Sequence, residues 1–265
     1  MRTLRRYLRL LGIQLRASLL LSMQYRFDFL LELVMVAFWS ASSLVPLLVL
    51  FQMRTGVAGW TWPEALVVFS FFMIVKGILS GAIQPALGNA VEHIRKGTLD
   101  FLLLKPADAQ FLVSTARFDF ARVSDLLGGS VLLGYAVMHT GRVPTLTAIG
   151  MTLLLLLGAV SILYSIWLVL LSLAFLVVKV DNLSHLFLAL YDAARWPSTV
   201  FQGLLSFLFT FVIPLALMTT YPALAILDRI EPLQALLALG TAAVFLVMGR
   251  MVWLLSIRRY TSAGG

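Results

Sequence analysis

The 265-residue sequence contains no cysteine, and only 12% of its residues are charged. Without cysteine, disulfides and thiolate metal sites are excluded. The three histidines, His93, His139 and His185, are isolated and lack metal-ligand spacing. No G-x-S-x-G motif for a nucleophilic serine and no G-x-x-x-x-G-K-[ST] phosphate loop occurs. The sequence therefore predicts no catalytic residue, metal site or bound cofactor, and any ATP-driven work requires a partner chain.

Apolar residues, in contrast, are abundant and make up 61% of the chain. A soluble domain is about one quarter charged, so this composition is typical of an integral membrane protein. A helix needs roughly 20 apolar residues to span a bilayer. Six long apolar runs predict an all-α integral membrane protein with six transmembrane helices. The predicted spans are 27–52, 64–86, 120–139, 147–175, 199–220 and 232–256.

Lysine and arginine predict the orientation, because cytoplasmic loops carry an excess of them. With both termini inside, sixteen basic residues fall on inner segments, and Arg54, Arg142 and Arg229 fall on outer loops. We therefore expect an N-in, C-in topology. The net charge of +8 then reflects the inner membrane side rather than a face that binds nucleic acid.

The first 26 residues predict an amphipathic helix that lies on the membrane surface. Five arginines between Arg2 and Arg16 fall within a sector of roughly 100°, and leucines between Leu4 and Leu15 cluster on the opposite side. Such a helix places its arginines among anionic lipid headgroups and its leucines in the acyl boundary.

A second surface helix is predicted within the inner loop 179–198. Apolar residues between Leu183 and Leu190 recur at helical spacing after Asn182, a residue that can cap a helix start. This helix should lie on the inner surface and end before Pro197.

One charge is predicted to lie inside the bilayer. Lys76 is near the middle of the second span, where a charge must face protein or water. Glu32 on the first span is a possible partner. The sequence leaves two interpretations open: a structural or snorkelling lysine, or a lysine that lines a substrate path.

The second span also carries a face of small residues. Gly77, Gly81, Gln84 and Gly88 share one helical face, which favours close packing by another helix, and Gln84 can hydrogen-bond across the contact. The packing helix belongs either to this chain or to a second subunit.

A charged segment, EHIRKGTLDFLLLKP, separates the second and third spans on the inner side. Gly97 permits a left-handed turn and Pro106 ends the stretch after that turn, so the segment predicts helix, hinge, helix. Residues 101–104 would anchor it to the membrane interface. The charges then presented to a cytoplasmic protein are Glu92, Arg95, Lys96 and Asp100. A membrane-laid loop with solvated charges is the alternative.

The part HIRKGTLDFLLLKP resembles the I-R-x-G-x-L-D-x-x-L-x-x-P signature of bacterial ABC type 2 exporter permeases. The basic amphipathic start, the Tyr221-Pro222 pair and the Arg258-Arg259-Tyr260 finish are similar to that family as well. The likeness covers essentially the whole chain, and the segment from His93 to Pro106 is its most specific part.

This resemblance implies a permease subunit of an ATP-driven exporter in the bacterial cytoplasmic (inner) membrane. Such a subunit pairs with an identical or homologous permease and binds two ABC ATPase subunits, which hold the ATP and magnesium. The resemblance implies that Glu92–Pro106 seats in the ATPase, with His93 and Gly97 beside the four charges above. It also implies that the outer segment YPALAILDRIEP caps the exit path.

The chain is then expected to be one transmembrane domain. Its parts would be an elbow helix at 1–26, two spans in 27–86, a cytoplasmic coupling region at 87–119, four spans in 120–256 and a cytoplasmic tail at 257–265. Two other functions stay open, namely an ATP-independent secondary transporter, which would carry repeats and midplane polar residues, and a membrane scaffold or sensor.

Overall fold

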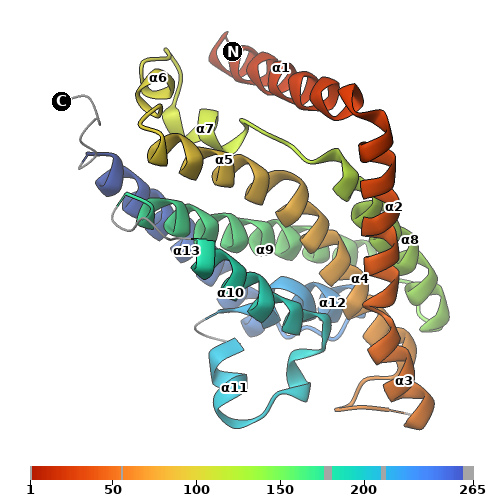
Figure 1. The fold of residues 1–265 in the computed structure, drawn as a ribbon. Helices are drawn as coiled ribbons and strands as arrows, with labels where there is room; N and C mark the ends of the chain where they lie inside the picture. The colour runs from red at the N-terminus through yellow and green to blue at the C-terminus, as the bar shows by residue number, and fades with distance from the viewer. Residues whose placement is uncertain (1, 55, 176–180, 210–212, 259–265) are drawn as a thin grey trace.

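The computed structural model of the chain describes residues 2–54, 56–175, 181–209 and 213–258 (Figure 1). Within these ranges every regular element is a helix, as the sequence predicts. Five helical stretches are long and apolar enough to cross a membrane, and they agree with five of the predicted spans. The stretches are Arg26–Met53, Trp62–Arg95, Phe120–His139, Leu146–Leu173 and Pro232–Arg258.

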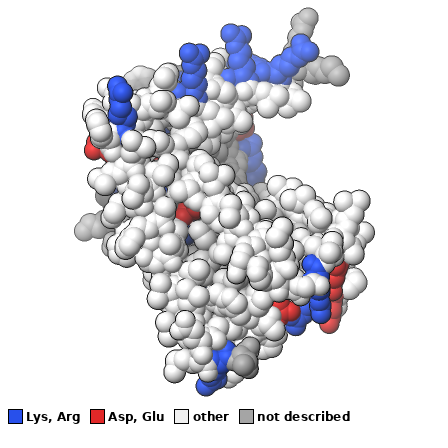
Figure 2. Space-filling model, turned by 90° about the vertical axis from the view of Figure 1, so that its right-hand side faces the viewer, with Lys and Arg blue, Asp and Glu red and all other residues white. Residues whose placement is uncertain are grey.

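The helices form a bundle with two polar ends. One end carries α6 (Asp100–Leu103) and is called the α6 end; the other carries the loop around Trp60 and is called the Trp60 end. Figure 2 shows basic side chains along the upper edge, both signs of charge along the lower edge and a largely uncharged surface between them. This uncharged band is what burial in a bilayer requires, because charges inside hydrocarbon are costly.

The first span follows α1 (Arg2–Gln24) after a sharp turn at Tyr25 (Figure 1). It consists of α2 (Arg26–Ser42) and α3 (Val45–Met53), separated by a short break. The break precedes Pro46, which fits the first turn of a helix but cannot continue one.

The second span, which we call the spine, consists of α4 (Trp62–Ile78), the π-helical turn η1 (Leu79–Ile83) and α5 (Gln84–Arg95). It starts with a capping box between Thr61 and Glu64. It continues beyond its predicted end at residue 86. The spine is the most enclosed of the five candidate spans, with 67% of its apolar window buried.

Pro85 interrupts the hydrogen bonding of the spine. Because proline has no N–H, it cannot donate to the carbonyl of Gly81, four residues earlier. The backbone N–H of Asp119, just before η2 (Phe120–Arg122), donates to that carbonyl instead at 2.8 Å. This bond fixes the spine to the start of the third span.

The third span consists of η2 and α8 (Val123–His139) and packs tightly along the spine. A Cβ added to Gly77 would lie 2.9 Å from Leu126, and one added to Gly129 would lie 3.0 Å from the backbone nitrogen of Ile74. Glycine is required at such contacts because any side chain would force the helices apart.

The fourth and last spans form a second close pair. α9 (Leu146–Leu173) and α13 (Pro232–Arg258) approach through Gly249, whose added Cβ would lie 3.1 Å from the Cβ of Ser165. The closest contacts again occur where one helix has no side chain.

The helix predicted within 179–198 is present, but its predicted location is wrong. α10 (Asp181–Tyr191) and the 3-10 turn η3 (Asp192–Arg195) end before Pro197, as expected. The helix does not lie on the inner surface. Its buried Tyr191 stacks on Phe72 of the spine, with ring centroids 5.4 Å apart.

The residues after η3 reach the Trp60 end. The indole N–H of Trp60 donates to the hydroxyl of Thr199 at 2.9 Å, and that hydroxyl donates to the carbonyl of Ala58 at 3.3 Å. α10 and η3 therefore run beside the spine toward the Trp60 end. The reason is the aromatic stripe of Phe187 and Tyr191, one turn apart, which buries against apolar side chains rather than a polar surface.

The predicted fifth span at 199–220 is also wrong, because its described residues form short pieces rather than one helix. Gly203, with φ +59°, and Pro214 interrupt it. The pieces are η4 (Ser198–Val200), α11 (Gly203–Phe207), the π-helical turn η6 (Ala216–Thr220) and α12 (Tyr221–Ile226), which comes directly after η6.

Gly129→Ala should destabilise the protein by about 1–3 kcal/mol, because the new methyl meets the spine backbone, which cannot move aside. Gly134→Ala on the same helix should be neutral or stabilising by up to about 1 kcal/mol, since nothing lies within 4 Å and alanine favours helix. Thermal unfolding followed by size-exclusion chromatography in detergent measures both. Equal melting temperatures for the two variants would contradict this packing.

Candidate functional site

The charged segment at the α6 end has the predicted helix, hinge, helix form. α5 ends at Arg95, and Gly97 adopts φ +64°. The N–H of Thr98 donates to the carbonyl of His93 at 2.9 Å, and the two side chains meet at 2.7 Å. His93 and Gly97 therefore shape the turn, and α6 after it is a single helical turn.

Three charges of the segment, Glu92, Arg95 and Lys96, are exposed and paired with one another, whereas Asp100 after the hinge is half-buried. Glu92 forms ion pairs with Arg95 at 3.3 Å and with Lys96 at 3.4 Å. The Lys96 side chain is 70% exposed and the Glu92 side chain 51%. Exposed pairs contribute little to stability, so they can exchange partners when another protein binds.

The apolar residues after the hinge divide into two groups. Leu99 is fully buried, and Leu102 and Leu103 pack against the core. Phe101 and Leu104 are 70% and 81% exposed. Of the four residues predicted as a membrane anchor, two therefore hold the segment on the bundle and two project from it.

Asp108 connects this segment to the rest of the bundle. It caps the short helix α7 (Ala109–Ser114), because its carboxylate accepts from the N–H of Phe111 at 2.9 Å. Its own N–H donates to the Tyr7 hydroxyl of α1, and its carboxylate pairs with Arg250 of α13 at 3.2 Å. This role was not among the sequence predictions, although an aspartate just before a helical run is an N-cap signal.

α7 is joined to α9 as well. The amide of Gln110 donates to the hydroxyl of Tyr164 at 2.8 Å, and Ser114 meets the same hydroxyl at 2.7 Å. The side-chain carbonyl of Gln110 accepts from the Arg250 guanidinium. Side-chain and backbone contacts thus connect Asp108 and α7 to α1, α9 and α13, and no spacing in the sequence indicates these contacts.

The residues of the predicted packing face on the spine lie in two different surroundings. Gly77 and Gly81 contact the third span of the same chain. Gly88 has nothing within 4 Å of an added Cβ, and Gln84 and Gly88 line a cavity of about 420 Å³ instead. Other residues around this cavity are Asn89, Glu92, Arg117, Arg122, Trp167 and His185.

A second cavity, of about 680 Å³, lies between α1, α2 and the spine. Its acidic lining residues include Asp28, Glu32 and Asp119, with Arg117 as their basic neighbour. Pro85 and other spine residues border both cavities. Polar cavities therefore flank α5 on two sides.

Glu32, which the sequence offered as a possible partner for Lys76, forms no ion pair with it. Across the described residues, no carboxylate lies within salt-bridge distance of Lys76, whose ammonium lies 5.5 Å from the ring centroid of Phe72. The reason is α8, whose Asp125 accepts from Ser40 of α2 and also abuts Gly77 of the spine. α8 thus separates the two helices at this depth.

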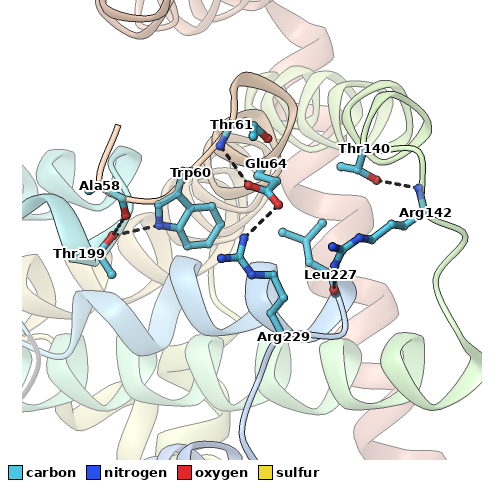
Figure 3. Close-up of polar contacts among 9 residues, drawn as sticks. All are labelled: Ala58, Trp60, Thr61, Glu64, Thr140, Arg142, Thr199, Leu227 and Arg229. Atoms are coloured by element: carbon cyan, nitrogen blue, oxygen red, sulfur yellow. Dashed lines mark hydrogen bonds and ion pairs between the residues drawn. The ribbon is translucent and has the colours of Figure 1, made fainter. Parts of the chain in front are cut away.

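A polar network closes the Trp60 end (Figure 3). Arg229 pairs with Glu64 at 2.9 Å and lies 5.5 Å from the ring centroid of Trp60. Arg142 donates to the carbonyl of Leu227 at 3.4 Å. With the Trp60 and Thr199 bond, these contacts join four segments at this end, and none of them was predicted from the sequence.

Comparison with known proteins agrees with this arrangement of membrane helices and polar ends. The model of a family described as ABC-2 family transporter protein matches residues 37–264. The chain is therefore a multi-pass membrane protein of the transporter permease class, and it belongs to the ABC-2 transporter family. No curated protein and no solved structure matches it significantly.

Asp108→Ala should loosen α7, because it removes both the helix cap and the pair with Arg250; loss of the cap alone costs about 0.5–2 kcal/mol. Hydrogen exchange of residues 109–114 should accelerate. Asp108→Ser should retain most of the protection, since serine caps equally well. If both variants exchange like the unsubstituted protein, Asp108 does not hold α7.

Proposed function

We propose that the chain is the permease subunit of an ATP-driven ABC exporter, paired with a second permease and driven by two separate ATPase subunits. The observation that carries this proposal is the segment Glu92–Pro106, which ends the spine in exposed, mutually paired charges and two exposed apolar side chains. Family membership supports it. The ATPase subunits would bind the ATP and magnesium, because this chain has no phosphate loop.

The chain would cross the bacterial cytoplasmic membrane six times, with both termini inside. Five crossings are the candidate spans. α10, η3 and the residues that lead on to Thr199 at the Trp60 end supply the sixth in place of 199–220. Arg195 then leaves the group of inner basic residues, but the excess of lysine and arginine at the α6 end remains.

α1 would lie in the inner membrane interface as an elbow helix. Arg5 and Arg9 are exposed, and so are Leu4 and Leu8. A helix that exposes both arginines and leucines on different sides suits the boundary between headgroups and acyl chains. The contacts of α1 with Asp108 would couple it to the ATPase-facing segment.

Transport would begin when ATP draws the two ATPase subunits together and so changes their contacts with Glu92–Pro106. Only contacts that differ between the nucleotide states can shift the permease. The shift would pass along the spine directly and through α7 into α9 and α13. The network at the Trp60 end would then have to open for export.

Mild-detergent purification from the native membrane should recover a stoichiometric soluble ATPase, identified by mass spectrometry. Arg95→Glu combined with Lys96→Glu should remove it, because both new charges would repel Glu92 and any acidic partner. Arg54→Glu, an exposed reversal near the Trp60 end, should retain it. An ATPase that stays bound to the double variant would disprove docking at this segment, and its absence from the unsubstituted protein would favour a secondary transporter.

The topology can be tested with single cysteines, because the chain has none of its own. Val143→Cys and Gln202→Cys should react with a membrane-impermeant maleimide in intact cells, since both positions are exposed near the Trp60 end. Leu104→Cys should react only after permeabilisation. Labelling of residue 202 from the inside would show that α10 does not cross the membrane.

A further inference from the structure

Three ionisable side chains lie together at the middle depth of the bundle, and no function above uses them. A helix rises about 1.5 Å per residue. Along the spine, Phe72 therefore lies about 15 Å from Trp62, and Lys76 lies about 21 Å from it. The hydrocarbon core is roughly 30 Å thick. Phe72 therefore lies close to the bilayer midplane, and Lys76 lies about one helical turn further toward the α6 end.

η3 brings a second cation to the same ring. The Arg195 guanidinium lies 5.8 Å from the centroid of Phe72, and the Lys76 ammonium lies 5.5 Å from it. Tyr191, which stacks on Phe72 at 5.4 Å, holds η3 in this position. Asp192 pairs with Arg195 at 3.3 Å. We call Lys76, Asp192 and Arg195 the midplane cluster.

The midplane cluster is not sealed inside the protein. The side chains of Asp192 and Arg195 are 47% and 22% exposed, and Lys76 is also partly exposed. Exposure of such charges to hydrocarbon costs several kcal/mol, whereas exposure to water or to a polar ligand does not. This face of the spine and α10 must therefore adjoin a hydrated passage or a polar partner.

The charge of the cluster indicates which partner suits it. The cluster holds two cations and one carboxylate, and that carboxylate, Asp192, already pairs with Arg195. Lys76 has no carboxylate within reach among the described residues. An incoming anion would therefore gain two charge-assisted hydrogen-bond donors. On the exposed side of α10, Leu183 and Leu186 offer apolar surface for an alkyl chain.

We propose that the midplane cluster binds the acidic headgroup, carboxylate or phosphate, of an amphiphile on its way through the transporter. This inference rests on the proposed transport function and names the substrate class. Lys76 and Arg195, which both lie at the ring of Phe72, bind the headgroup. Asp192 competes with the ligand for Arg195, so that the anion can leave again.

Binding is measured with the protein in phosphatidylcholine nanodiscs, using dansyl-labelled undecanoic acid as the fluorescent probe and empty nanodiscs as background. Lys76→Met with Arg195→Met should weaken binding about tenfold or more, because both charge-assisted contacts are lost. Lys76→Arg should retain it. Asp192→Asn should strengthen binding, a result that a purely structural ion pair would not give. Arg54→Met is the matched control and should change nothing.

Competition tests the ligand chemistry. Dodecyl phosphate should displace the probe, and dodecyl trimethylammonium should not. Displacement by phosphatidylglycerol as well would support a lipid headgroup as the ligand, and displacement by dodecyl phosphate alone would support a monomeric amphiphile. Equal displacement by the cationic detergent would overturn the proposal. Unchanged probe binding by the double variant would also overturn the proposal. This holds even if the double variant dissociates a permease dimer while its probe binding stays unchanged.

The double variant must elute as a monodisperse protein, which shows that it is folded. If the double variant does not, the comparison of Lys76→Arg with the unsubstituted protein still tests the role of the positive charge. Co-purification of the ATPase separates this inference from the proposed function. The double variant should retain the ATPase, because the cluster is far along the spine from Glu92. Loss of the probe with retention of the ATPase supports an anion site in a coupled permease.

Discussion

A bilayer offers no hydrogen-bond partner to a backbone, so every main-chain polar group inside it must be satisfied by the chain itself. Pro85 breaks this rule within the spine, because the carbonyl of Gly81 loses its helical donor. The N–H of Asp119 supplies the missing bond. The absence of a side chain at Gly81 lets the third span approach closely enough to do so. The spine can therefore run unbroken from the Trp60 end to the charged segment Glu92–Pro106.

This bond joins the spine to the third span between the two polar ends. On the side of this bond toward the Trp60 end, the spine is enclosed by the other helices and contacts the midplane cluster. On the side toward the α6 end, α5 is flanked by two polar cavities. α7 adds a second connection, since its side chains reach α1, α9 and α13. A force at the α6 end thus has two routes into the membrane, one along the spine and one through α7.

The sequence predicted those features that depend on local pattern. Apolar runs placed five spans to within a few residues, except at Arg95, where polar residues continue a helix beyond the membrane. The hinge at Gly97 was predicted because glycine favours positive φ. The close contacts at Gly77 and Gly81 were predicted from small residues on one face.

Features that depend on tertiary contact could not be predicted. Hydropathy alone favoured 199–220 over α10, because burial of Phe187 and Tyr191 against the spine cannot be recognised without knowing the neighbour. Lys76 and Glu32 were natural partners by charge, but α8 stands between their helices. Asp108 and Arg250 join segments that are 142 residues apart, and no local pattern indicates such a contact.

The central claim is that Glu92–Pro106 is the surface through which another protein drives the bundle. Hydrogen–deuterium exchange of the purified protein, with its co-purified ATPase and after that ATPase is stripped away, tests it most directly. We expect strong protection of residues 92–106 and weaker protection of 109–114 in the complex, with little change in the loop around Trp60. Protection confined to other segments, with residues 92–106 unchanged, would contradict it.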